Sequence, residues 1–367
     1  MTHPEKILEF VPTLPRFFPA AQQAMLTPLF SHRSTAFDTL YRTTAAMLPP
    51  LLGLSGFTAI LCAGTGTFAN ELLVWNYAAA ARRPLALCNG EFGQRLFRQC
   101  RSCRADALGL DFGWGAPFDA NRLAAILQQH PEIDLLLAVA TETSTGMMND
   151  LALLDRLAKQ HGIKIVLDGV SALGTRRDWE QFSAVIAISG SSGKALAALP
   201  GIAIVLLHPD TLPEQSPEHR PYALDLSAIL TAVHQPGAVR NTLSSLLLSV
   251  LAAAGRDLAE LGPDRYILRL RDGKARLIKG LAECGITPLP GSDSPMITAF
   301  RRPSGLDWED FSRRLNRSGF GIYHRPAYLA ERELFEIATM GDFPPKTVNA
   351  LLRAFQTALR YPVRLKI

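Results

Sequence analysis

Short, uninterrupted runs of apolar residues recur between residues 57 and 207. They alternate little between apolar and polar positions, which is typical of strands buried on both faces of a sheet. Stretches long enough for helices separate them, so the pattern predicts an α/β fold with a mostly parallel sheet flanked by helices. The predicted strands are 57–62, 84–88, 133–140, 163–167, 184–188 and 202–207, and the predicted helices are 68–81, 92–103, 121–130 and 151–161.

The pattern changes after about residue 210. The stretch 209–221 carries four prolines and predicts a loop or flap. Beyond it, longer helices alternate with short strands, which predicts a smaller C-terminal α+β domain. The predicted helices there are 243–261, 265–283, 308–316 and 346–360, and the strands are 296–300 and 321–324. We therefore divide the chain into an N-terminal segment at 1–30, a large domain at 31–261 and a small domain at 262–367.

Composition narrows the class of protein. Hydrophobic residues make up 48% and charged residues 19%, as in an ordinary soluble globular protein. The net charge of +5 is modest, and we expect no nucleic-acid partner. No run approaches the roughly 18 apolar residues of a membrane span, and the N-terminus does not resemble a signal peptide. Five scattered cysteines favour a reducing compartment, so we expect a cytoplasmic protein that does not bind membranes.

Two local patterns in 92–104 have ordinary explanations. Cys100 and Cys103 form a lone CxxC without a second pair or a histidine cluster, so we expect two thiols on successive helical turns and no metal site. Arginines at spacing three share one helical face, for which an exposed surface is the first interpretation and an anion-binding patch the second. These arginines are Arg95, Arg98, Arg101 and Arg104.

The most informative residue is Lys194. It lies in a loop of small residues, 189–195, directly after a predicted buried strand. A partly desolvated amine there can act as a neutral nucleophile and form a Schiff base with an aldehyde. Asp168 ends the preceding predicted strand. A lysine that holds the aldehyde and an acid that keeps the ring nitrogen protonated are what pyridoxal 5'-phosphate (PLP) requires.

Further polar residues follow predicted strands at the same edge, where ligands bind in open parallel sheets. The turn at 64–67 opens a predicted helix and would suit a phosphate, and 141–146 supplies hydroxyl groups. A Walker loop is excluded, because Ile188 takes the place of its glycine and Ala195 that of its Ser or Thr. The turn also lacks the third glycine of a dinucleotide fingerprint.

Taken together, these stretches resemble the class V aminotransferases of PLP fold type I, near the alanine–glyoxylate and 2-aminoethylphosphonate–pyruvate aminotransferases. The resemblance implies a large PLP-binding domain, a smaller C-terminal domain and a homodimer. The matching stretches are 31–33, 63–67, 89–95, 141–146, 168–174 and 194–201.

The resemblance also implies roles for individual residues. Lys194 would hold the cofactor and move the substrate proton, and Asp168 would pair with the pyridinium. Phe92 would stack over the ring, with Val170 beneath it, although plain core packing also explains both residues. The other implied cofactor contacts are Gly66, Thr67 and Ser191, Thr143 at the phenolic oxygen, and Thr242 at the phosphate of the neighbouring subunit.

Departures from the family concern the substrate. Relatives carry an arginine that clamps a carboxylate where this chain has Glu336, and 10–15 replaces an early Gly-Pro turn. Gly193 replaces a polar phosphate contact. We expect another arginine, Arg33 or Arg240 first and Arg325 next, to hold the anionic end of the substrate. The rival hypothesis is that Glu336 receives a cationic amine.

We therefore expect a PLP-dependent aminotransferase that works by a ping-pong mechanism. Its partners would be a small amino acid or aminophosphonate-like donor and a 2-oxo acid acceptor, pyruvate or glyoxylate. A lyase, desulfurase or decarboxylase on the same fold is the second hypothesis. A non-catalytic protein that keeps the PLP fold is the third.

Overall fold

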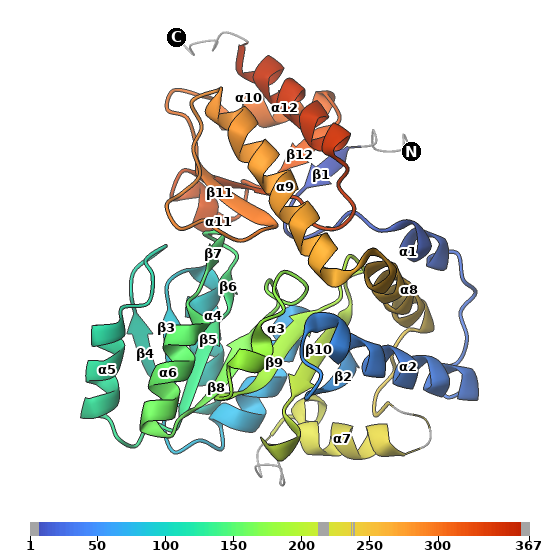
Figure 1. The fold of residues 1–367 in the computed structure, drawn as a ribbon, viewed down its shortest axis with the longest axis vertical. Coiled ribbons are helices and arrows are strands. Elements are labelled where there is room, and N and C mark those ends of the chain that lie inside the picture. The colour runs from blue at the N-terminus through green and yellow to red at the C-terminus, as the bar shows by residue number, and fades with distance from the viewer. Residues whose placement is uncertain (1–6, 212–219, 236, 238, 361–367) are drawn as a thin grey trace.

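The computed structural model describes residues 7–211, 220–235, 237 and 239–360. At its centre lies a seven-stranded sheet in the order β2-β10-β9-β8-β5-β3-β4 (Figure 1). Every strand but β10 runs in the same direction, which confirms the predicted, mostly parallel α/β sheet. The strands are β2 (Thr58–Ala63), β3 (Pro84–Cys88), β4 (Leu108–Asp111), β5 (Leu135–Val139), β8 (Lys164–Asp168), β9 (Val185–Ser191) and β10 (Ile202–Leu207).

Successive side chains of a strand point to opposite faces, and both faces of this sheet are covered. In β10, Ile202 and Ile204 belong to one hydrophobic core, whereas Ala203 and Val205 belong to another. This explains why the strands read as continuous apolar runs. The first core includes residues of α2 (Thr35–Leu52), α5 (Ala120–Gln129), α6 (Leu151–His161) and α8 (Ser245–Leu261), and the second includes residues of α3 (Gly66–Leu73), α4 (Glu91–Cys103) and α7 (Leu226–His234).

A third core gathers the C-terminal elements, which lie above the sheet in Figure 1. Its strand β11 (Ile297–Arg301) pairs antiparallel with β13 (Leu334–Ala338). The division of the chain into domains at residue 261 stays a prediction. The helices of this part are α9 (Pro263–Ala282), α10 (Trp308–Arg317), α11 (Ala327–Ala330) and α12 (Pro345–Arg360).

The N-terminal segment joins both parts of the molecule. Strand β1 (Leu8–Phe10) pairs with β12 (Phe320–Ile322), and Phe10 is buried in the third core. Helix α1 (Pro19–Ala24) lies instead on α8, where the backbone N–H of Ala20 donates a 3.1 Å hydrogen bond to Asp257. The residues between β1 and α1 are therefore held at both ends.

Some elements differ from the predictions. The helix predicted at 68–81 begins at Gly66 and continues beyond α3 as a π-helical turn, η1 (Val74–Ala78). The predicted loop at 209–221 falls mostly outside the described residues. Within the described ranges, every helix is too short or too polar to cross a membrane.

Candidate active site

A cavity of about 250 Å³ lies at the edge of the sheet where the parallel strands end. The loops after β2, β5, β8 and β9 meet there, and Thr13 of the N-terminal segment lines another side. The structure thus brings together most of the residues predicted to bind a cofactor. Those lining the cavity are Gly66, Thr67, Phe92, Thr143, Asp168, Val170, Ser191 and Lys194.

Lys194 projects its amine into this space from the turn after β9. Its Nζ donates a 2.6 Å hydrogen bond to the carbonyl oxygen of Pro12. Burial, helped by the positive charge of Arg95, lowers the pKa of Lys194 to about 8, although Glu336 and Asp168 act in the opposite direction. Near neutral pH a larger fraction of this amine is therefore unprotonated than for an exposed lysine, so it can attack a carbonyl carbon.

Asp168 ends β8 as a buried carboxylate. It accepts hydrogen bonds from Asn70 Nδ2 at 2.6 Å and from the backbone N–H of Val170 at 3.0 Å. Asn70 is held in turn by the hydroxyl of Ser189 on β9. Burial raises the pKa of Asp168 despite these hydrogen bonds, so a cationic partner in the cavity would stabilise its charged form.

The N-terminus of α3 forms another wall. Thr65 caps this helix, its Oγ1 accepting from the backbone N–H of Phe68 at 3.4 Å. A Cβ atom at Gly66 would lie 2.6 Å from Cγ2 of Val170, so only glycine lets the helix approach the loop after β8. The first backbone N–H groups of a helix have no partner within it and favour anions. Gly66 and Thr67 present this helix end to the cavity.

Phe92 is positioned by a buried carboxylate on a neighbouring loop. Glu142 accepts from the backbone N–H groups of Phe92 at 3.3 Å and Gly93 at 3.0 Å, and from Ser144 Oγ at 2.5 Å. Burial raises the pKa of Glu142. A Cβ atom at Gly90 would lie 2.4 Å from the Glu142 side chain, so the start of α4 can approach this carboxylate only with glycine there.

The four arginines predicted to share one face of α4 have separate surroundings. Arg98 and Arg101 are exposed, as the first interpretation expects. Arg95 instead lines the cavity, with its guanidinium 4.4 Å from the centre of the Phe92 ring, so the surface interpretation is wrong for it. The sequence signal for Arg95 is its place one helical turn after Phe92.

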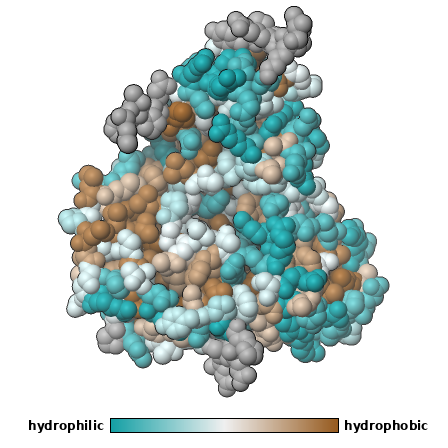
Figure 2. All heavy atoms as spheres, turned by 180° about the vertical axis from the view of Figure 1, so that it is seen from behind, coloured by the Kyte–Doolittle hydropathy of each residue, from teal (hydrophilic) through white to brown (hydrophobic). Residues whose placement is uncertain are grey.

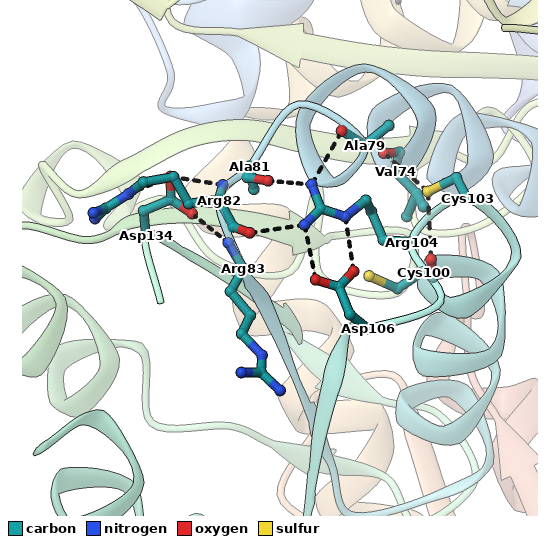
Figure 3. Close-up of polar contacts among 10 residues, drawn as sticks. All are labelled: Val74, Ala79, Ala81, Arg82, Arg83, Cys100, Cys103, Arg104, Asp106 and Asp134. Atoms are coloured by element: carbon teal, nitrogen blue, oxygen red, sulfur yellow. Dashed lines mark hydrogen bonds and ion pairs between the residues drawn. The ribbon is translucent and has the colours of Figure 1, made fainter. Parts of the chain in front are cut away.

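Arg104 has a structural role, shown in Figure 3. Its guanidinium donates to the carbonyl oxygens of Ala79, Ala81 and Arg82 and forms a 3.0 Å ion pair with Asp106. These hydrogen bonds fasten the loop that leads into β3 to the end of α4. Cys103 lies beside it in α4 and donates from Sγ to the carbonyl oxygen of Cys100 at 3.3 Å, so the predicted placement of both thiols on one helix is confirmed.

Glu336 lies in the middle of β13 and is fully buried. Neither carboxylate oxygen has a hydrogen-bond partner among the described residues. Burial raises the pKa of Glu336 well above its ordinary value. The positive charge of Lys194 opposes this rise and the negative charge of Glu142 adds to it. The C-terminal part of the chain therefore places a buried acid, without a hydrogen-bond partner among the described residues, within electrostatic reach of the Lys194 amine.

The arginines proposed to bind substrate lie outside this cavity in the single chain. Arg33 donates to the carbonyl oxygen of Val239 at 3.0 Å. Arg240 pairs with Asp225 at 3.5 Å and stacks on Tyr222. Arg325 is exposed, 4.0 Å from Glu309, and Thr242 is also exposed. Their roles toward the substrate or a neighbouring subunit stay predictions.

These groups fit PLP. The cavity combines an amine, a buried acid and a helix N-terminus, the chemistry that the aldehyde, the ring nitrogen and the phosphate need. Thr143 Oγ1 and Ser171 Oγ lie 2.6 Å apart in its wall. Thr141 Oγ1, also in the wall, is buried without a partner among the described residues and is free to bond to a polar ring substituent.

Comparisons with known proteins agree with this arrangement. The chain is 31% identical to the 2-aminoethylphosphonate–pyruvate transaminase of Aeromonas hydrophila, over 83% of this chain and 81% of that protein. The transaminase of the same name from Vibrio cholerae is 28% identical, over 83% and 84%. No protein-family model matches the chain.

Solved structures agree as well. The alanine–glyoxylate aminotransferase from Nostoc superposes with a TM-score of 0.88 at 24% identity, covering 97% of this chain and 96% of that chain. An aspartate aminotransferase from Thermus thermophilus superposes with a TM-score of 0.86 at 25% identity, covering 96% and 98%.

Proposed function

The chain belongs to the class V aminotransferases, PLP-dependent enzymes of fold type I, and on that premise we propose which groups it transfers and how. The donor is a small amino acid or aminophosphonate-like amine, and the acceptor is a 2-oxo acid such as pyruvate or glyoxylate. Donor and acceptor use the same cavity in turn, in a ping-pong cycle. The observation that carries this proposal is the single cavity shared by the Lys194 amine and the buried Asp168 carboxylate.

Bound PLP supplies an electron-withdrawing ring that stabilises negative charge on the carbon next to the transferred nitrogen. Lys194 would hold the cofactor through its amine and, once the donor has displaced it, would accept a proton from that carbon. Its pKa of about 8 suits this work, because a base is most effective when its pKa lies near the working pH. Asp168 would pair with the ring nitrogen and keep a proton on it.

The remaining groups would bind and orient the cofactor and the substrate. Gly66 and Thr67 hold the phosphate at the N-terminus of α3. Phe92 would cover the ring, and the N-terminal segment at Pro12 and Thr13 limits the access of water to the amine. Arg95, which makes no ion pair with a described residue, holds the carboxylate of the 2-oxo acid through its two parallel N–H donors.

A homodimer completes the site in this proposal, because Thr242 of a second copy contacts the phosphate. Exposed apolar side chains support a contact between copies: Leu26 is 83% exposed and Leu29 is 71% exposed. Figure 2 shows a broad hydrophobic area on the side where α1, α2 and α8 lie in Figure 1. Light scattering tests this directly: Leu26→Asp with Leu29→Asp should yield monomers that bind PLP more weakly.

The experiment for the reaction uses purified protein loaded with PLP. An amino donor should abolish the visible absorption of the cofactor in the absence of acceptor, and pyruvate or glyoxylate should restore it. Borohydride treatment should label Lys194. Release of ammonia from the donor, with no dependence on a 2-oxo acid, would contradict amino transfer and support a lyase.

A further inference from the structure

Glu336 is a buried acid that lacks a hydrogen-bond partner among the described residues. Its carboxylate is fully buried, yet no described group donates a hydrogen bond to either oxygen. An unpaired carboxylate away from water is unfavourable unless a cation or donors reach it. An unpaired carboxyl within electrostatic reach of the Lys194 amine is therefore a candidate for contact with a ligand.

The charges around Glu336 narrow the choice of partner. Of the described cations, Lys194 is the one whose charge lowers the pKa of Glu336, whereas the negative charge of Glu142 raises it. Arg95 acts on Lys194, Asp168 and Tyr323 instead. In the proposed function the amine of Lys194 is engaged with the cofactor, so it would no longer be free to pair with Glu336.

Glu336 is connected to a group of aromatic residues through its strand partner. The backbone of Glu336 pairs with that of Tyr323, whose hydroxyl is hydrogen-bonded to Tyr328. The Tyr328 ring lies 6.3 Å from that of Phe92 and 6.1 Å from that of Trp114. Two of these rings already carry an arginine of the chain, Arg95 over Phe92 at 4.4 Å and Arg332 over Trp114 at 3.9 Å, so this part of the molecule attracts cations and not anions.

We propose that Glu336 is the anionic group of a substrate subsite that binds a second, positively charged group at the far end of the amino donor. Among small amino acids and amines, the donor is then one that carries an additional ammonium or guanidinium group, for which a diamine is the simplest probe. This deepens the proposed function and rests on it. Within the donors considered above, it disfavours those with a phosphonate or second carboxylate at the far end.

Matched amines test the subsite. Diamines of two to five carbons are compared with monoamines that carry a methyl group, and with amino acids that carry a carboxylate, in place of the second ammonium. Binding is measured by calorimetry on the borohydride-reduced, PLP-loaded enzyme, which cannot turn over. The efficiency of the half-reaction, kcat/KM, is measured on the active enzyme by the loss of cofactor absorption.

At the best chain length we expect the diamine to bind about 10- to 100-fold more tightly than its monoamine, as for a hydrogen bond to a charged group. In Glu336→Gln this ratio should fall to about threefold or less, whereas Glu336→Asp should keep part of it. Glu283→Gln, at an exposed position of the C-terminal part, is the matched control and should leave the ratio unchanged.

Two results would overturn the subsite. Equal binding of diamine and monoamine to the wild-type enzyme would remove the need for it. An equal effect of Glu336→Gln on all amines would show that the carboxylate acts on Lys194 or on the reacting amine instead. Failure of the proposed function looks different: no donor would change the cofactor absorption, while calorimetry would still report the ratio.

Discussion

The Nζ of Lys194 lies 2.6 Å from the carbonyl oxygen of Pro12, so an amine at the end of a central strand is bound to the N-terminal segment. A carbonyl oxygen accepts a hydrogen bond from the amine in either protonation state. The low pKa of the lysine therefore comes from burial and Arg95, and not from loss of hydrogen bonding.

The first prediction concerns the pH dependence of cofactor binding. Only the neutral amine of Lys194 attacks the aldehyde, so the rate of PLP attachment to the apoprotein should rise with pH up to about 8 and then level off. Stopped-flow absorbance measures this rate. A rate that continues to rise toward pH 10.5, the ordinary lysine value, would contradict the lowered pKa.

The second prediction concerns Asp168, the acid expected to pair with the ring nitrogen. Asp168→Asn should lower kcat by about 100- to 1,000-fold, because it removes a preorganised charge that stabilises the protonated ring. Asn70→Ala should have a smaller effect in the same direction, since it only releases one hydrogen bond to Asp168. Steady-state kinetics and PLP titration measure both. Asp210→Asn, at an 85% exposed side chain, should leave kcat unchanged.

The third prediction concerns the close contact of α3 with the loop after β8. Gly66→Ala should lower the free energy of unfolding by about 1–3 kcal/mol, because the new methyl group collides with Val170. Adding Val170→Ala makes room and should recover part of the loss in a double-mutant cycle. Urea unfolding of the apoproteins measures these free energies of unfolding. Strict additivity of the two substitutions would show that they do not share this contact.

The fourth prediction concerns the stability cost of Glu336. Glu336→Met should raise the free energy of unfolding of the apoprotein near pH 7 by about 1–3 kcal/mol, since it removes an unpaired buried carboxyl. The folded pKa lies above the ordinary value of 4.5, so the wild type loses stability as the pH rises through 4.5, where the unfolded chain ionises first. The gain should therefore shrink below pH 4.5. A destabilised variant at neutral pH would contradict the absence of a partner.

Much of the fold follows from local pattern. The strands at 84–88 and 202–207 begin at Pro84 and directly after Gly201, and their continuous apolar runs reflect burial on both faces. Strand β4 is missing from the predictions, because it has only four residues, alternates half-buried with exposed positions and lies at the edge of the sheet. The π-helical turn at η1 has a sequence spacing that does not distinguish it from a continued α-helix.

Some residues of the site could likewise be predicted from the sequence, and others could not. Lys194, Asp168 and Gly66 could be placed because each follows a strand, and parallel strands end at one edge. The direction of Arg95 into the cavity and the burial of Glu336 depend on how α4 and β13 pack, which distant parts of the chain decide. Arg33, Arg240 and Arg325 are predicted to bind substrate from their residue type alone. Residue type does not indicate how far a side chain lies from Lys194.

The path of the N-terminal segment has a practical consequence for making this protein. Because β1 completes one hydrophobic core and the next few residues reach the catalytic amine, a shortened chain that begins at α1 would lose a core strand and the acceptor of the lysine proton together. An affinity tag fused ahead of residue 7 would be attached almost directly to that strand, which begins at Leu8. A cleavable tag, or one at the other end of the chain, is therefore the better choice for any titration of the amine.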